Sequence, residues 1–590
     1  MPRSRARGAD GRRRDAPSAG RRRTFGSCRC IRRRRPIGRG RGPGSAWRTR
    51  LALAGPDAAV NLDLTTAGPG VTNMSVGAVA AGVSYTGTIT PNASLGYRLG
   101  GGGTLTLPNT NALTGSRNVT VTNGGTVAVT GNNNYTGVTT IRGDYIHTHD
   151  SFARDNASTN SIVARPYNAR VNSTLVASVL GNGGTPSSIG SSSSAASNLV
   201  LSGGTLKYVG SGATSDRLFS IDTTGATLDS SGAGALNLNN TGAAAVLDVG
   251  PLTVATLTTG GTARLLNGIS DISRLTVGMT VTADVAGVAT FLPAGSTIQG
   301  IAPNFGFTGG SPFIRTNNLQ AVVSLGSVAA ATNATLTFGN QNRNLNLTGT
   351  NAGANTLAAQ LVDSAAGKLG LAKSGTGAWS VTGANNTFSG GVTVDAGTLT
   401  VKKLLNNGTT TINGGTLRIG PGGSVGDPTS TSKFVGDGFS IAGGATPAGR
   451  LDVAKNGVIF DYDVNSPEAS IRALIIAGRA GGSWTGNGIT SSDAAALSGT
   501  HGVGYAEASS VGSPSPFLGV ASDSTAVLVR YTRLGDANLS GGVSLDDFTS
   551  LAAAFGAPGG NWSKGDFNYD GNVNLDDFTL LAANFGQNAS

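Results

Sequence analysis

Residues 373–401 read KSGTGAWSVTGANNTFSGGVTVDAGTLTV, and this stretch decides the fold class. Its apolar residues fall at every second position on both sides of a turn that is rich in Gly and Asn. Alternation with a period of two predicts β-strands that turn one face inward and the other outward. Gly and Asn tolerate the left-handed backbone that a tight turn needs. The stretch therefore predicts short strands joined by corners.

A shorter cassette, a Gly-rich turn followed by Thr and alternating apolar residues, recurs along the chain. Copies begin at residues 102, 124, 203, 396 and 414. The copies at 102 and 124 are 22 residues apart, and those at 396 and 414 are 18 residues apart. That spacing is typical of one coil of a solenoid. One coil cannot bury its inner face alone, so stacking between neighbouring coils has to provide the stability. The repeats predict a mainly β chain that folds as a β-solenoid.

The charge of the chain is concentrated at its N-terminus. The formal net charge is +12, but residues 1–50 hold 18 Arg and two Asp, which leaves −4 for the remainder. A basic surface for nucleic acid is not indicated. Residues 1–55 are predicted to be a disordered Arg-rich tail, with a mis-assigned start codon as the alternative. No apolar run is long enough for a membrane span, and no apolar core of a signal peptide is visible in this tail.

Residues 373–401, together with 181–190 and 198–208, resemble the autotransporter-associated β-strand repeat of bacterial surface passenger domains. The resemblance implies a right-handed parallel β-helix, here assigned to residues 56–430, on an extracellular or cell-surface protein. Residues 145–172 lack the cassette and are predicted to be an inserted loop. The cassettes fade over 431–533, which predicts closing coils and a cap, with a hairpin around Asn456-Gly457.

A 22-residue segment occurs twice near the C-terminus. Residues 535–556 and 565–586 are identical at 15 positions. Each copy places oxygen-bearing side chains at alternate positions around a Gly, as a hard cation such as calcium requires. The second loop is predicted to bind Ca²⁺ more strongly, because Ser540 stands in the first loop where Asp570 stands in the second. The predicted ligands are Asp566, Asn568, Asp570, Asn572 (through its carbonyl), Asn574 and Asp577 in the second loop, and Asp536, Asn538, Ser540, Gly542, Ser544 and Asp547 in the first.

Apolar residues at helical spacing follow each loop and predict a short helix. This tandem of EF-hand-like loop and helix, residues 534–590, resembles the dockerin module. The resemblance implies anchoring to a cohesin-like protein or another component of the cell envelope. The chain departs from that family at Leu545-Asp546 and Leu575-Asp576, where members often carry small hydroxyl residues.

Two functions are compatible with these patterns. The favoured one is a structural or adhesive surface protein, docked through the calcium loops. The other is a polysaccharide lyase or glycoside hydrolase built on a β-helix and tethered in the same way. Cleavage of a polysaccharide by hydrolysis needs paired carboxylates, and such pairs are hard to find outside 535–577. No catalytic residue is therefore predicted, and a polysaccharide remains open as a ligand.

Overall fold

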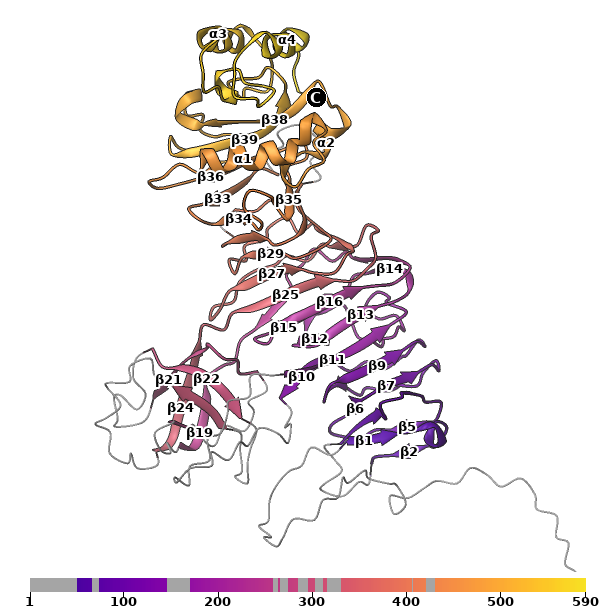
Figure 1. Ribbon diagram of the computed structural model, residues 1–590. Coiled ribbons are helices and arrows are strands. Elements are labelled where there is room, and N and C mark those ends of the chain that lie inside the picture. The colour runs from indigo at the N-terminus through magenta and orange to yellow at the C-terminus, as the bar shows by residue number, and fades with distance from the viewer. Residues whose placement is uncertain are drawn as a thin grey trace, which may run out of the picture.

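The computed structural model describes residues 50–65, 74–145, 170–257, 264–265, 274–284, 295–302, 311–315, 331–405, 407–420 and 430–589. Most of the predicted Arg-rich tail lies outside these residues. The chain forms an elongated stack of parallel strands, with a smaller sheet beside it and a helix-bearing unit at its C-terminal end (Figure 1). The predicted predominance of β structure is confirmed, and most strand pairs are parallel.

The parallel stack consists of three ladders of parallel strands. The first ladder contains β1 (Arg50–Leu53), β3 (Ser75–Ala78), β6 (Tyr97–Gly102), β8 (Val119–Val121), β10 (Thr139–Tyr145), β12 (Leu199–Ser202), β15 (Ser220–Asp222) and β18 (Ala245–Leu247). The second contains β4 (Val83–Ser84), β7 (Thr104–Leu107), β9 (Gly125–Val129), β11 (Arg170–Ala177), β13 (Thr205–Tyr208), β16 (Ala226–Ser230), β25 (Arg343–Thr348), β27 (Leu369–Lys373), β29 (Val392–Val394), β31 (Thr410–Ile412) and β34 (Phe439–Ile441). The third contains β14 (Ser211–Ser215), β17 (Gly234–Leu238), β26 (Thr356–Leu357), β28 (Ala378–Val381), β30 (Thr398–Val401), β32 (Gly415–Ile419), β35 (Gly449–Asp452) and β37 (Gly488–Thr490). A short pair, β2 (Leu62–Asp63) and β5 (Ile89–Thr90), lies near the N-terminal end.

The predicted cassettes form strands that stack on one another in register. Leu105 of β7 pairs with Val127 of β9, and Leu399 of β30 pairs with Leu417 of β32. The apolar residues of these strands are buried and the residues between them are not, as the period of two predicts. Stacked apolar rows thus form the core of the stack.

Two Asn residues, each in a turn rich in Gly and Asn, connect neighbouring coils. The side chain of Asn133 donates to the Gly131 carbonyl oxygen and accepts from the Leu113 N–H at 2.8 Å. Asn386 makes the same pair of bonds, to the Gly383 carbonyl oxygen and from the Leu361 N–H at 2.9 Å. Each Asn therefore closes its own corner and also holds the coil before it.

The chain leaves the parallel stack twice. The first excursion is the predicted loop, which starts and ends where Gly143–Tyr145 of β10 pairs antiparallel with Arg170–Asn172 of β11; residues 146–169 lie outside the described residues. No sequence pattern indicated the second. Leu228 of β16 pairs with Leu347 of β25, although 119 residues separate them.

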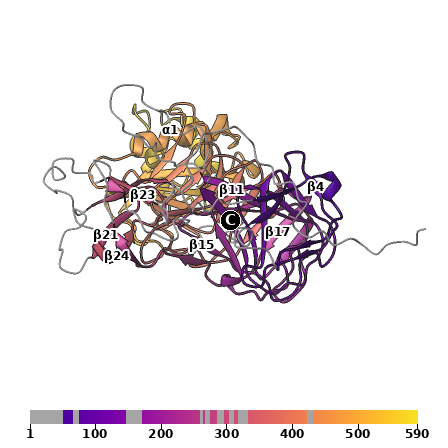
Figure 2. The same ribbon diagram turned by 90° about the horizontal axis from the view of Figure 1, so that it is seen from below.

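Within the second excursion the chain forms an antiparallel sheet to one side of the stack, as both ribbon views show (Figures 1 and 2). Its strands, in spatial order, are β19 (Leu252–Leu257), β24 (Ala331–Gly339), β21 (Thr280–Asp284), β22 (Thr297–Ala302), β23 (Ser311–Arg315) and β20 (Arg264–Leu265).

A four-stranded sheet, here called the cap sheet, covers the C-terminal end of the stack. Its order is β33 (Ser432–Val435), β36 (Gly457–Asp461), β39 (Ala526–Arg533) and β38 (His501–Glu507). The predicted hairpin around Asn456-Gly457 is wrong, because β35 pairs with strands of the stack whereas β36 pairs with β33 and β39. Asn456 is buried and its side chain donates to the Ile419 carbonyl oxygen, so the chain crosses there from the stack to the cap sheet.

Helices occur in the C-terminal part of the chain. They are α1 (Glu468–Arg479), α2 (Ser492–Ala496), α3 (Leu545–Ala554) and α4 (Leu575–Asn584). Short 3-10 turns are η2 (Gly55–Asp57), η3 (Ala196–Asn198), η4 (Ala480–Gly482), η5 (Ala508–Val511) and η6 (Trp562–Lys564). Among the described residues, no helix has the length and apolar character needed to cross a bilayer.

Candidate metal centre

The last residue of each predicted calcium loop also caps the start of the helix that follows. Asp547 and Asp577 each complete a capping box with the first residue of the turn, Ser544 and Asn574. Asp577 Oδ1 accepts the N–H groups of Phe567 and Asn568, at 2.8 and 3.1 Å. The other oxygen, Oδ2, accepts the N–H of Asn574, one of the groups that the start of a helix leaves free. One carboxylate therefore ties the beginning of its loop to the beginning of its helix.

The first residue of the second loop, Asp566, is fully buried and only half satisfied. Its Oδ2 accepts from the Gly571 N–H at 3.1 Å and from Arg472 Nη2 at 3.0 Å. Its Oδ1 has no hydrogen-bond partner among the described residues. Burial raises the pKa of this carboxyl group, against the opposing effect of Arg472. A buried carboxylate oxygen without a partner is unfavourable by itself, and it fits a position for a cation ligand.

The equivalent residue of the first loop, Asp536, has partners on both oxygens. Oδ2 accepts from the Gly541 N–H at 2.9 Å and from the Thr532 hydroxyl, and Oδ1 accepts from the Ser540 N–H at 2.9 Å. Burial raises the pKa of Asp536 from 3.8 to about 6. The ionised form is therefore costly in this loop too, but no oxygen is left free.

The remaining predicted ligands lie close together within each loop. Asn568 Oδ1 accepts the Asp570 N–H, and Asp570 Oδ1 accepts the Asn572 N–H, both at 2.8 Å. The Asn572 N–H lowers the pKa of Asp570 below its ordinary value. Asn574 Oδ1 accepts the Asp576 N–H at 2.7 Å.

The first loop repeats the turn around Asn538, whose Oδ1 accepts the Ser540 N–H, and Ser540 Oγ donates to the Gly542 carbonyl oxygen. These bonds fold each loop around its alternating oxygens. In the described part of the chain, no three His, Cys, Asp or Glu side chains come close enough to form a metal cluster on their own. A bound ion would therefore depend on amide, hydroxyl and backbone oxygens in addition to the carboxylates.

Sequence reasoning missed the residues outside the loops that hold their first carboxylates. Arg472 lies on α1, and Thr532 lies on β39. Arg472 is 94 residues from Asp566, so no local motif connects the two.

The helices α3 and α4 expose matching apolar side chains. The predicted stripe is only partly buried: Leu551 and Leu581 point inward, while Phe548 and Phe578 are partly exposed and meet edge to face, with ring centroids 6.2 Å apart. About half of Phe555 and of Phe585 is exposed, and Leu545 and Leu575 are each 66% exposed. The duplicated helices thus present one apolar face with the same residues in each half.

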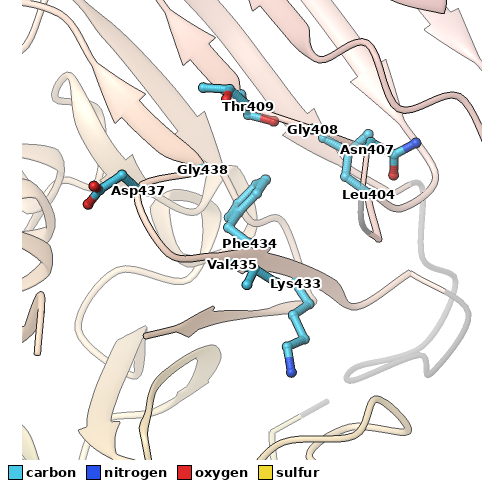
Figure 3. A pocket seen from close by; sticks show the side chains of 10 residues that line it. Leu404, Asn407, Gly408, Thr409, Lys433, Phe434, Val435, Asp437 and Gly438 are labelled. Carbon is cyan, nitrogen blue, oxygen red and sulfur yellow. The ribbon is translucent and has the colours of Figure 1, made fainter. Parts of the chain in front are cut away.

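A pocket of about 450 Å³ lies where the stack meets the cap sheet (Figure 3). Its lining includes Leu404, Thr410 and Phe434, and its charged residues are Lys433 and Asp437. The close-up shows the Asp437 and Lys433 side chains pointing away from each other. The pocket therefore contributes one carboxylate and no pair.

Parts of the parallel stack match the family model described as passenger-associated-transport-repeat. The matched residues are 119–143, 371–401 and 406–419, which contain β8, β9 and β28 to β32 whole. The predicted resemblance to autotransporter repeats is confirmed for these segments.

A relative among curated proteins is also named as an autotransporter. The chain is 30% identical over 393 residues to the protein named Adhesin BmaC autotransporter of Brucella suis biovar 1 (strain 1330). The alignment covers 56% of this chain and 10% of the adhesin, so the chain spans about a tenth of that relative's length. No solved structure matches the chain significantly.

Proposed function

We propose that this chain is an exported, adhesive protein of the bacterial surface and that its parallel stack is a right-handed β-solenoid. The proposal rests on one observation: the segments that match the repeat family are also segments of the parallel stack. The segments that match passenger-associated repeats include the strands that stack in register, such as β30 on β32. The relative named an autotransporter adhesin supports the same location and role. In this proposal the outer face of the parallel stack binds a partner and catalyses no reaction.

The C-terminal loops bind two calcium ions in this proposal, more strongly in the second loop. Asp566 Oδ1, Asn568, Asp570, the Asn572 carbonyl oxygen and Asp577 would hold the tighter ion, with Asn574 beside them. Asp536, Asn538, Ser540, the Gly542 carbonyl oxygen, Ser544 and Asp547 would hold the weaker one. The ion would add positive charge beside these buried carboxylates. The buried, unpartnered Asp566 Oδ1 supports this assignment.

Docking would use the apolar face of α3 and α4, against a cohesin-like protein or another envelope component. Exposed apolar patches of this kind mark interaction surfaces in soluble proteins. The alternative of a tethered polysaccharide-cleaving enzyme finds no such support, since the pocket at the end of the stack contributes only Asp437 as a carboxylate. A polysaccharide remains open as a ligand of the rod.

The test is surface attachment of the full chain on cells of the organism that encodes it. We expect protease added to intact cells to cleave the chain, and a calcium chelator to release it into the medium. The double variant Asp566→Ala, Asp577→Ala should be exported but released without chelator. A chain that stays protected inside the cell would contradict export, and attachment that ignores both chelator and variant would contradict calcium-dependent docking.

A further inference from the structure

The fourth residue of each proposed calcium loop is inserted into the body of the protein. Tyr569 and Leu539 hold the same place in the two loops, and both have a left-handed backbone, with φ of 65° and 57°. Both side chains are buried. The Tyr569 hydroxyl donates to the Val503 carbonyl oxygen on β38, 66 residues earlier in the chain. A left-handed backbone is unfavourable for these residue types, so the loop conformation and the insertion of the side chain depend on each other.

The cap sheet is shaped to receive these loops. Gly504 lies in the middle of β38, and a Cβ atom there would come within 2.6 Å of Trp562 Nε1 and 2.8 Å of Leu539. Trp562 is fully buried between the two loops, and its indole N–H donates to the Asp536 carbonyl oxygen at 2.7 Å. Its ring also packs against Tyr569, with centroids 5.5 Å apart. The absence of a side chain at Gly504 therefore allows the loops to lie directly on the strand.

Polar contacts join the same two parts. Arg530 of β39 donates to the Leu539 carbonyl oxygen at 2.7 Å, and Thr532 of the same strand donates to Asp536. On the other loop, Arg472 of α1 pairs with Asp566. The first carboxylate of each loop thus accepts a hydrogen bond from a side chain outside the loop, on β39 for the first loop and on α1 for the second.

Helix α1 connects the second loop to the end of the stack. A Cβ atom on Gly478 would overlap the Ile489 carbonyl oxygen at 2.0 Å, so α1 lies directly on β37, the last strand of the third ladder. Arg472, on the same helix, contacts Asp566. A continuous set of packed residues therefore runs from the second loop through α1 to the last coil.

We propose that calcium binding and the folding of the cap sheet are one cooperative event, so that calcium closes the C-terminal end of the stack. This inference rests on the proposed calcium sites. A solenoid must cover its last coil, and here the covering unit holds the metal loops inside its own core. A ligand that binds only the folded state stabilises it, and the coupling is reciprocal: residues that only pack the cap must affect calcium affinity.

The test uses the full chain, calcium chloride as the only ligand, and two measurements. Calorimetry gives the calcium affinity, and hydrogen exchange follows the amides of β38 and β39, which carry no proposed ligand. We expect calcium to slow exchange in both strands. Gly504→Ala should weaken calcium binding by about tenfold or more, within the range of ordinary coupling between sites. Gly204→Ala is the matched control, because its Cβ would meet Ile141 Cγ2 at 2.5 Å within the stack, far along the chain from the loops.

Tyr569→Phe provides a milder second variant if Gly504→Ala does not fold. It keeps the ring and removes only the hydrogen bond to Val503, so affinity should fall by about fivefold. Three results would overturn the inference: wild-type affinity in both variants, an equal loss in Gly204→Ala, or exchange in β38 and β39 that calcium does not change. Each of these leaves the calcium sites themselves in place. Absence of any calcium binding by the wild-type chain would instead remove the proposed sites and this inference together.

Discussion

The two C-terminal loops share most of their sequence, but they differ in how their first carboxylate is satisfied. Asp536 has partners on both oxygens, whereas Asp566 is equally buried and leaves Oδ1 without one. The side chain from outside the loop that bonds to this carboxylate differs as well. It is the neutral hydroxyl of Thr532 for the first loop and the guanidinium of Arg472 for the second. The two copies of the motif therefore stabilise their buried carboxylate with different hydrogen-bond partners.

The comparison shows that the spacing of the oxygen-bearing residues alone does not rank the two proposed calcium sites. Ser540 provides an N–H and a hydroxyl to Asp536, while Asp570 turns its carboxylate toward Asn572 and adds negative charge to its loop. The first loop is therefore closer to being satisfied without a cation. Calcium affinity in such loops rises with the number of charged ligands, and both considerations favour the second loop.

The largest expected effect comes from removing the carboxylates of the second loop. Asp566→Ala with Asp577→Ala should remove the tighter calcium step, a loss on the order of 100-fold in affinity for that site. The matched control, Asp536→Ala with Asp547→Ala, should remove only the weaker step. Calorimetric titration of both double variants separates the two steps, and a tight step that survives in the first variant would reverse the ranking of the loops.

Making the loops alike should reduce the difference between them. Ser540→Asp gives the first loop the carboxylate that Asp570 gives the second, and we expect calcium affinity there to rise by about tenfold. The measurement is titration in the Asp566→Ala, Asp577→Ala background, where only the first loop binds. Unchanged affinity would mean that residue 540 is not a ligand.

The pH dependence of the first loop follows from the pKa of Asp536, which burial raises to about 6. A raised pKa means that the calcium-free fold loses stability as pH rises through this range, because the buried group must ionise. Calcium binds the ionised form, so affinity should be constant above about pH 7 and fall by up to about tenfold per unit below pH 6. Titration at pH 5 and 7.5 in the same double-variant background tests this expectation, and equal affinity at the two values would contradict it.

The smallest effect on stability is expected on the exposed face of the helices. Leu545→Gln with Leu575→Gln alters two side chains that are each 66% exposed, so unfolding free energy should change by less than about 0.5 kcal/mol. Calcium affinity should stay the same, while attachment to the cell surface should be lost. Thermal unfolding, titration and the protease assay on cells measure the three quantities; attachment at the wild-type level would show that docking uses another surface.

Local patterns in the sequence predicted the strands of the stack and the grouping of oxygens in each loop. Leu399 and Leu417 follow a period of two, and Asp570 and Asn572 are neighbours in one turn, so the sequence itself places them together. The features that were missed depend on pairs far apart in the chain. In the antiparallel sheet beside the stack, β19 pairs with β24 although neither strand contains a cassette. The predicted hairpin at Asn456-Gly457 does not form, and Asn456 bonds instead to Ile419, 37 residues earlier.

The same reason explains what was missed around the loops. Arg472 and Gly504 act on residues tens of positions away, and neither belongs to a motif. The glycines at 502 and 504, alternating along a strand with buried Val503 and Tyr505, are a signal of a closely packed face. That signal does not reveal which segment packs there.

The most direct test of the account is calcium titration of the calcium-free full-length chain by calorimetry. The full chain is required because the loops lie on β38 and β39 and would lose these contacts in isolation. We expect saturable binding of two ions with unequal affinities, the tighter one assigned to the second loop by its loss in the Asp566→Ala, Asp577→Ala variant. Absence of binding at millimolar calcium would contradict the account, and would leave the C-terminal repeats as a cap without a metal.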